Sequence, residues 1–379
     1  MARYQMRRDP IQNDVDRRSL LSSLTALAAT AFARAAEAAA VPLRLAPGYP
    51  RSYGRIVEIA RREKKLTIYS ATPFEEAAEL VANFRALYPF ITVEYENLKS
   101  FDLYRRFMAE AGANRVVVDL LINSAMDLQI KLVNDGYIQP YASPEKPNLP
   151  DWAVWKNEAY AVSAEPVVFV YNKRLMPAGD VPRSHEALQS LLDRKFRNYQ
   201  GKITLYNPEV SSTGFLCLTQ DVRIDRDTWK LVRALGRTKP KMYANNDEIF
   251  RRVRSGEHWL AYNMVGSYAL AQQQKDPNLG VVVPNDYALM ISRIALIPKD
   301  APHPASAKLF LDFVLSRRGQ SLLGKHHMKP LRPDVPWGGA PVDSSTAQAI
   351  RVGPALLVNL DQLKRANFLK QWRRALANG

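Results

Sequence analysis

Hydroxyl and amide side chains follow four of the strands expected in this sequence, where each strand gives way to a helix. Such a turn combines polar side chains with free backbone N–H groups at a helix start, where the helix dipole favours negative charge. Each residue also suits a helix cap, so capping alone is the competing interpretation. We expect them to bind an anionic group of a small molecule, and they are Ser70, Thr72, Ser124, Ser211, Ser212, Thr213, Asn263 and Ser267.

The turn Ser211-Ser212-Thr213-Gly214 is the most informative of the four. Hydroxyls that precede a glycine allow the backbone to close tightly on an oxyanion. Arg293 and Lys173 could add positive charge, or could face solvent. This turn is therefore the expected centre of an anion site.

Signatures of catalysis are missing from the sequence. There is no Gly-x-Ser-x-Gly motif, no Walker motif and no dinucleotide-binding glycine fingerprint. The five histidines lie away from the four turns, and Cys217 sits in an apolar helical context that predicts a buried structural thiol. We therefore expect binding without catalysis, cofactor or resident metal.

The order of elements predicts two α/β units. Strands and helices alternate in the first unit, which is the pattern of a doubly wound fold. The chain is expected to leave this unit near residue 164 and to return near 286, so that two strands form a hinge. The expected domains are an export signal at 1–38, a first lobe at 39–164 and 287–379, and a second lobe at 165–286. Expected strands lie at 66–69, 90–95, 116–122, 160–171, 202–206, 259–263, 279–284 and 288–298, and expected helices at 55–65, 75–88, 101–111, 305–315 and 320–323.

The first 38 residues have the composition of an export signal. Arg17 and Arg18 precede a mildly apolar stretch and small residues that suit cleavage after Ala38. The paired arginines resemble a twin-arginine signal, and a Sec signal that happens to carry them is the alternative. Either route places the mature protein in the periplasm.

Composition narrows the class of partner. The 379 residues are 47% hydrophobic, which excludes general disorder, and the stretch Ser19–Ala33 is too short to span a bilayer. The formal charge is +16, or about +14 without the six basic and four acidic residues of 1–38. Such a charge suits an anionic ligand, although a generally basic proteome would also explain it. No nucleic-acid-binding motif is present, so we expect no nucleic-acid partner.

Four stretches, in this order, resemble the solute-binding proteins of bacterial ABC importers: 63–70, 171–175, 180–203 and 304–320. The similarity covers roughly 60–330 and points to the type II proteins of extracellular solute-binding family 1, in the branch of ferric-iron, sugar-phosphate, phosphoglycerate and polyamine binders. One departure is His185, where the family commonly has tryptophan, and it bears on packing. The resemblance implies two lobes that close on a solute, with the four turns facing one cleft. It also implies an ABC permease of the inner membrane as partner, and we expect a monomer.

The presence or absence of a tyrosine pair distinguishes a ferric-iron binder from a binder of organic anions in this family. Ferric binders of this family use adjacent tyrosines after the strand at 259–263, whereas Met264–Tyr268 holds one tyrosine and no pair. The family's metal ligands therefore do not carry over. Asp286 and Tyr287 could ligate a metal, but we expect them to be polar groups at the hinge that help to bind the solute. The predicted ligand is a small phosphorylated or carboxylated organic anion. The alternatives are a periplasmic sensor for a two-component receptor kinase and a ferric-iron binder.

Overall fold

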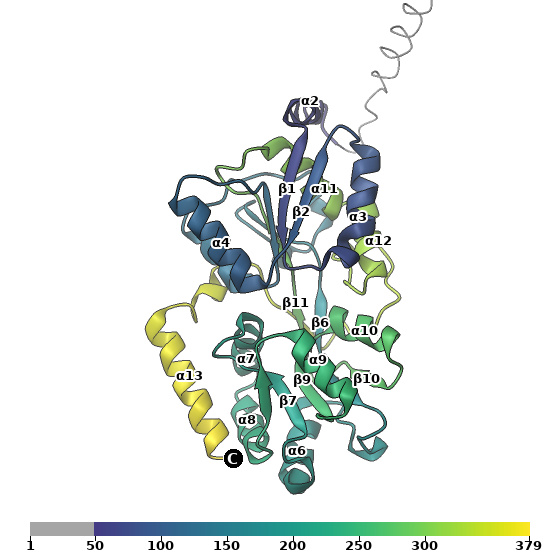
Figure 1. Ribbon diagram of the computed structural model, residues 1–379, viewed down its shortest axis with the longest axis vertical. Coiled ribbons are helices and arrows are strands. Elements are labelled where there is room, and N and C mark those ends of the chain that lie inside the picture. Colours follow the sequence, from purple (N-terminus) through teal and green to yellow (C-terminus); the bar gives the residue numbers. More distant parts are fainter. Residues whose placement is uncertain (1–48) are drawn as a thin grey trace, which may run out of the picture. The chain divides into compact units, whose positions relative to one another are not determined.

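Two β-sheets organise the computed structural model, which describes residues 49–379 (Figure 1). The expected export signal at 1–38 lies outside the described residues. Residues 55–379 form one compact unit. We call each sheet with the helices packed on it a lobe, the first lobe being the one that contains β1.

The first sheet has the strand order β2-β1-β3-β12-β5-β4. Strands β1, β2 and β3 are parallel, so their carboxyl ends, at Ser70, Asn97 and Asn123, meet at one edge. The expected strand at 116–122 begins only at Leu120, because the Asp119 carboxylate accepts the N–H of Thr67 there. The strands are β1 (Lys65–Ser70), β2 (Thr92–Asn97), β3 (Leu120–Asn123), β4 (Val154–Trp155), β5 (Ala159–Ala161) and β12 (Ile294–Leu296).

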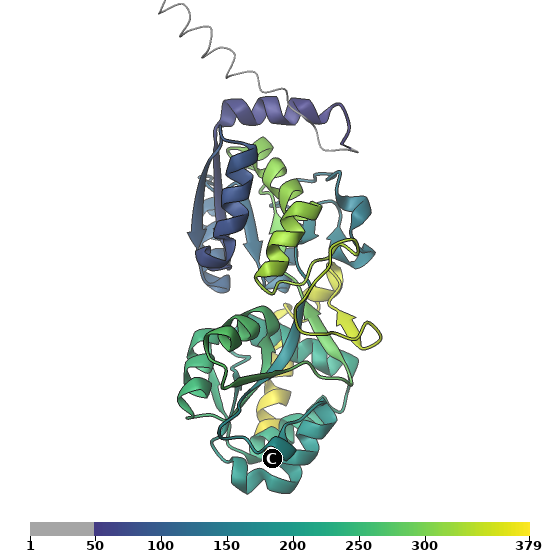
Figure 2. The same cartoon turned by 90° about the vertical axis from the view of Figure 1, so that its right-hand side faces the viewer.

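Helices cover both faces of this sheet (Figure 2). Helix α3 shows how the sequence selects them: it begins after Pro73, carries Glu75 and Glu76 in its first turn, and buries apolar residues at helical spacing. The first lobe contains the helices α2 (Tyr53–Glu63), α3 (Phe74–Leu87), α4 (Ser100–Gly112), α5 (Met126–Asn134), α11 (Pro304–Leu315) and α12 (Arg317–Lys325), and the short helices η1 (Lys146–Asn148) and η2 (Asp151–Ala153).

The second sheet has the order β13-β11-β6-β9-β7-β8, with β10 also paired to β6. Almost every residue of β6 is buried, which explains the long apolar run in its sequence. Its strands are β6 (Glu165–Asn172), β7 (Ile203–Tyr206), β8 (Lys241–Tyr243), β9 (Leu260–Val265), β10 (Leu279–Val282), β11 (Ala288–Ile291) and β13 (Ala347–Ala349).

The helices of the second lobe include α7, in which Cys217 is buried, as the apolar context predicts. They are α6 (His185–Lys195), α7 (Ser212–Ile224), α8 (Thr228–Arg237), α9 (Asn246–Ser255) and α10 (Gly266–Lys275), with short helices η3 (Ala178–Asp180) and η4 (Phe196–Tyr199). None of the helices within 49–379 has the length and apolar content that a bilayer crossing requires.

Two short segments, 162–164 and 292–293, connect the sheets side by side, and we call them the hinge. Val162 donates its N–H to the Arg293 carbonyl at 2.8 Å, and strands β6 and β11 pair antiparallel next to it. The expected stretches 160–171 and 288–298 therefore each supply one strand to each sheet, as β5 with β6 and β11 with β12.

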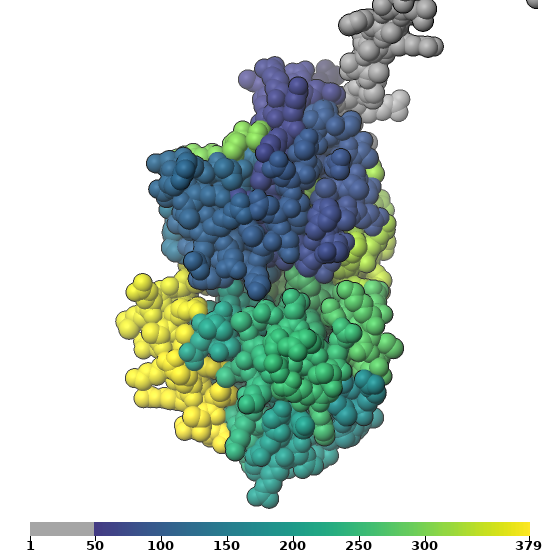
Figure 3. All heavy atoms as spheres, viewed as in Figure 1, coloured from purple at the N-terminus to yellow at the C-terminus, as the bar shows by residue number. Residues whose placement is uncertain are grey.

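Part of the segment 287–379, which is expected to belong to the first lobe, packs with the second lobe instead. Strand β13 pairs with β11 in the second sheet, and the short helix η5 (Pro354–Leu357) then packs against α5 of the first lobe. Helix α13 (Gln362–Ala377) packs along α8 of the second lobe, where it forms a surface ridge (yellow in Figures 1 and 3). Apolar contacts hold α13 there, because Trp372 and Ala375 are buried in the hydrophobic core of the second lobe.

Candidate functional site

An ion pair lies at the hinge between the lobes. Arg293, in the hinge itself, donates from Nε to Oε1 of Glu165 at 3.0 Å and from Nη2 to Oε2 at 3.2 Å. Glu165 begins β6 and is as deeply buried as Arg293, which is 2% exposed. Burial alone would raise the pKa of Glu165, but the charge of Arg293 and hydrogen bonds from Arg293, Ser163 and Ser267 hold it below its usual value. We call Arg293 and Glu165 the hinge pair.

The hinge pair contacts one turn from each lobe. Arg293 donates from Nη1 to Oγ1 of Thr72, which follows β1 in the first lobe. It also donates from Nη2, at 3.3 Å, to Oγ of Ser267 in the first turn of α10 in the second lobe, and Ser267 in turn donates to Glu165. The two turns therefore meet through a single arginine.

A second contact joins the same two turns. Tyr268 donates its hydroxyl to the Ala71 carbonyl at 3.2 Å, and the guanidinium of Arg293 lies 4.9 Å from the centre of the Tyr268 ring. Tyr95, from β2, donates its hydroxyl to the Thr72 carbonyl at 2.8 Å. Both phenol groups thus donate to backbone carbonyls of the turn that follows β1.

A third charged group borders this cluster. Oε2 of Glu76, in the first turn of α3, lies 3.7 Å from Nη2 of Arg293. That oxygen is buried and accepts no hydrogen bond from the described residues. Burial raises the pKa of Glu76, and the charge of Arg293 opposes the rise.

A separate polar network is centred on Asp221 of α7, whose side chain is fully buried. Tyr262 and Tyr287 donate their hydroxyls to its carboxylate at 2.7 and 3.0 Å, and Asn263 donates its side-chain amide. Burial raises the pKa of Asp221 even though His185 and these three donors lower it. Asn263 has φ near +60°, a conformation that asparagine tolerates better than most residues, so this contact holds an unusual backbone in place.

The structure distributes the ten predicted residues over several groups. Thr72 and Ser267 meet at the hinge pair, and Ser70 lies beside them, accepting the N–H of Thr72 at 3.1 Å. Asn263 and Tyr287 belong to the Asp221 network. The other five are placed as follows: Asp286 accepts the backbone N–H of His185, the hydroxyl of Ser124 lies 3.4 Å from that of Ser100, Ser211 caps α7 by accepting the Gly214 N–H, and Ser212 and Thr213 are half-buried in the first turn of α7. Their roles as solute contacts stay predictions.

Four charged residues of these clusters are not among the predicted site residues: Arg293, Glu165, Glu76 and Asp221. The sequence allows Arg293 to be either a source of positive charge in the site or a solvent-exposed residue, and the structure buries it. Lys173, considered with it, lies at the surface and donates to the Pro277 carbonyl. Opposite charges at Glu165 and Arg293, each interrupting an apolar strand sequence at the hinge, were the signal that could have revealed the pair.

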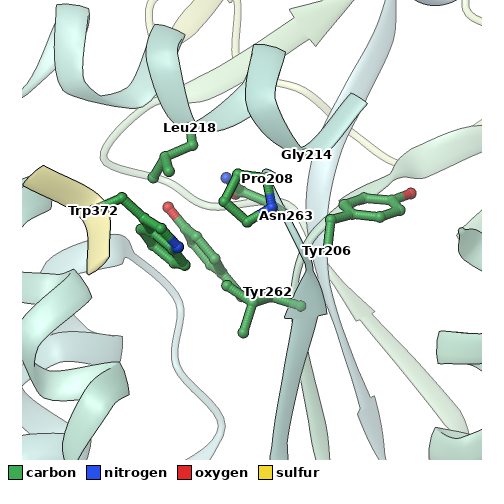
Figure 4. Close-up of a pocket in the computed structure, with 8 residues that line it drawn as sticks. Tyr206, Pro208, Gly214, Leu218, Tyr262, Asn263 and Trp372 are labelled. Atoms are coloured by element: carbon green, nitrogen blue, oxygen red, sulfur yellow. The ribbon is translucent and has the colours of Figure 1, made fainter. Parts of the chain in front are cut away.

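A small pocket lies beside the start of α7 (Figure 4). It has a volume of about 10 Å³, room for no more than one water molecule. Trp372 of α13 faces Tyr262 and Leu218 there, so the C-terminal helix closes this pocket. The rest of its lining is Leu205, Tyr206, Pro208, Gly214 and Asn263. Within 49–379, no three histidine, cysteine or acidic side chains gather closely enough to hold a metal ion.

The chain is similar in sequence and in fold to known bacterial solute-binding proteins. The family model for bacterial extracellular solute-binding proteins matches residues 116–347. The substrate-binding protein of an ABC transporter from Agrobacterium tumefaciens is 33% identical, and the match covers 82% of this chain and 94% of that one at a TM-score of 0.77. A search of curated proteins finds no significant match.

Two further solved structures share the fold at lower identity. Iron-bound HitA from Pseudomonas aeruginosa is 18% identical over 82% of this chain and 99% of its own, with a TM-score of 0.65. AfuA from Actinobacillus pleuropneumoniae, solved with fructose-6-phosphate, is 20% identical over 83% and 99%, with a TM-score of 0.66. The expected fold, two α/β lobes joined by two hinge strands, is confirmed by these neighbours.

Proposed function

Since the chain belongs to the bacterial extracellular solute-binding proteins, we propose that it is the periplasmic substrate-binding component of an ABC transporter. It captures a small phosphorylated or carboxylated organic solute between its two lobes and delivers it to the membrane permease. It works as a monomer after residues 1–38 have been removed, and capture involves no chemical reaction.

The observation that carries this proposal is the position of Arg293. Its guanidinium is held at the hinge by Glu165 and reaches Thr72 of the first lobe and Ser267 of the second. A solute that enters between these turns meets both lobes at one point. Closure of the lobes and occupancy of the site are therefore linked through the same side chains.

Helix starts support an anionic solute. Thr72 lies two residues before α3, Ser267 lies in the first turn of α10, and Ser212 and Thr213 lie in the first turn of α7. A helix start favours an anion by about 0.3–2 kcal/mol, and a hydrogen bond to a charged group adds about 1.5–3 kcal/mol. A few such contacts suffice for a dissociation constant of about 1 μM, which corresponds to about 8 kcal/mol.

Thermal denaturation with candidate solutes tests the proposal. We expect organophosphates or carboxylates to raise the melting temperature of the mature protein, and ferric salts to leave it unchanged. Tyr95 and Tyr268 both donate to backbone carbonyls, so iron binding through phenolates would require these hydrogen bonds to be lost. A visible charge-transfer band on addition of iron, as tyrosinate ligation produces, would establish a ferric binder instead.

A further inference from the structure

The charged groups at the hinge do not balance. Two carboxylates, from Glu165 and Glu76, lie beside one guanidinium, from Arg293. Glu165 uses both of its oxygens on Arg293 and also accepts the hydroxyls of Ser163 and Ser267. Glu76 is therefore the carboxyl group at the hinge that lacks a hydrogen-bonded cation.

Arg293 makes no hydrogen bond to Glu76 in this arrangement. Its Nε and both Nη atoms already donate to Glu165, Thr72 and Ser267, and the 3.7 Å separation from Glu76 is beyond hydrogen-bond length. Lys275, at the exposed end of α10, acts on Glu76 only through its longer-range charge, and no ion pair joins these two side chains. A buried carboxylate oxygen that accepts no hydrogen bond costs free energy, which a hydrogen-bonding cation bound beside it would recover.

Aromatic groups next to Glu76 suit an organic cation. Burial raises the pKa of Tyr95 to about 12, with the nearby charge of Glu76 acting in the same direction, and Glu76 acts similarly on Tyr268. Both phenols therefore stay neutral, with their hydroxyls directed to backbone carbonyls. The Tyr268 ring already carries the Arg293 guanidinium against it, as tyrosine rings attract cations.

We propose that the solute is a zwitterion whose ammonium group binds the carboxylate of Glu76. The inference rests on the proposed function, which supplies the anionic end of the solute at the hydroxyl-bearing helix starts. The ammonium group donates to Oε2 of Glu76, which accepts no hydrogen bond from the residues that the structure describes and has only the longer ion pair with Arg293. With this solute in place, the two carboxylates of the site face two cations.

A purely structural role for Glu76 and a role in solute binding predict different effects of Glu76→Gln on the melting temperature. An acidic residue in the first turn of a helix stabilises it through the helix dipole, and Glu75 occupies the same turn of α3 but is exposed. If Glu76 serves the fold alone, Glu76→Gln lowers the melting temperature of the solute-free protein. If it serves the solute, Glu76→Gln leaves that temperature unchanged or raises it, because a desolvated charge disappears, and weakens binding. Glu75→Gln is the matched control.

Isothermal titration with matched probe pairs completes the test: phosphoethanolamine against ethyl phosphate, and 3-aminopropanoate against propanoate. We expect the aminated member of at least one pair to bind wild type and Glu75→Gln about ten- to a hundredfold more tightly than its partner, the value of one charge-assisted contact, and this preference to vanish in Glu76→Gln. Equal binding within each pair overturns the zwitterion and leaves the anion proposal standing. Binding of putrescine with no binding of any anionic probe overturns both, as does failure of all four probes to bind.

Discussion

Nε of Arg293 lies 3.0 Å from Oε1 of Glu165 across the hinge, although 128 residues separate the two in sequence. The pair fixes the position of the guanidinium at the point where the lobes meet. The positive charge next to Thr72 and Ser267 is therefore held in place by a carboxylate, that of Glu165, which also accepts the hydroxyl of Ser267.

The hinge pair should show strong energetic coupling. Arg293→Ala leaves Glu165 buried without its cation, which should lower the free energy of unfolding by about 3–5 kcal/mol. The double variant Arg293→Ala with Glu165→Ala should lose less than the sum of the two single losses, because neither charge is then stranded. Urea denaturation of the four proteins measures this. Additive losses would show that the two side chains do not interact in solution.

Stability should depend on pH through Asp127, which lies buried at the start of α5. Burial raises the pKa of Asp127 to about 6, although the N–H of Leu128 and the charge of Arg365 lower it. The folded chain therefore keeps a proton that the unfolded chain loses between about pH 4 and pH 6. The free energy of unfolding should fall as pH rises through this window and then level off.

Asp127→Asn removes this titration. The variant should be more stable than wild type at pH 7 by about 1–3 kcal/mol and should lack the decline between pH 4 and 6. Exposed Asp102, at the start of α4, supplies the control Asp102→Asn, which should keep the wild-type profile. Chemical denaturation at a series of pH values distinguishes these outcomes, and an unchanged slope in Asp127→Asn would contradict the assignment.

Local sequence patterns predicted most of the elements, because each depends on residues that are close in sequence. The run from Val167 to Tyr171 predicts a buried strand, and a strand is observed there as part of β6. The partners of Arg293 are not local: Thr72 is 221 residues away, so no pattern around either residue shows that they meet. Helix α13 was not predicted, although Phe368, Trp372 and Ala375 have helical spacing, because nothing in the sequence indicated which surface their apolar stripe covers.

Helix α13 should contribute to the stability of the second lobe. Trp372 is 1% exposed and packs in the core of that lobe, so Trp372→Ala should cost about 3–5 kcal/mol of unfolding free energy. Leu363, on the same helix and 70% exposed, is the control, and Leu363→Ala should change stability by no more than about 0.5 kcal/mol. Equal effects of the two substitutions would show that α13 does not pack against the second lobe in solution.

Substitutions at the start of α7 can distinguish residues that cap the helix from residues that bind the solute. Ser211 caps the helix, so Ser211→Ala should lower stability by about 1 kcal/mol with little change in affinity. The double variant Ser212→Ala with Thr213→Ala should keep its melting temperature and weaken solute binding about tenfold or more, since charge-assisted hydrogen bonds are lost. Calorimetric titration beside a melting curve tests both. If the double variant binds its solute with wild-type affinity, Ser212 and Thr213 do not contact the anion, and the contact must come from Ser70, Thr72 or Ser124.

Export should expose a new N-terminus within a few residues of Ala39. Intact mass measurement of protein from the periplasmic fraction checks this, and retention of Met1 there would contradict it. Replacing Arg17 and Arg18 with lysine should block export only if the twin-arginine route is used.

Native mass spectrometry of the protein purified from its own periplasm tests the central claim most directly. The account predicts one small organic solute with a phosphate or carboxylate group bound to each chain, released on denaturation and much depleted in Arg293→Ala. A chain that carries ferric iron with no organic species, or one that carries a polyamine without an acidic group, would contradict it.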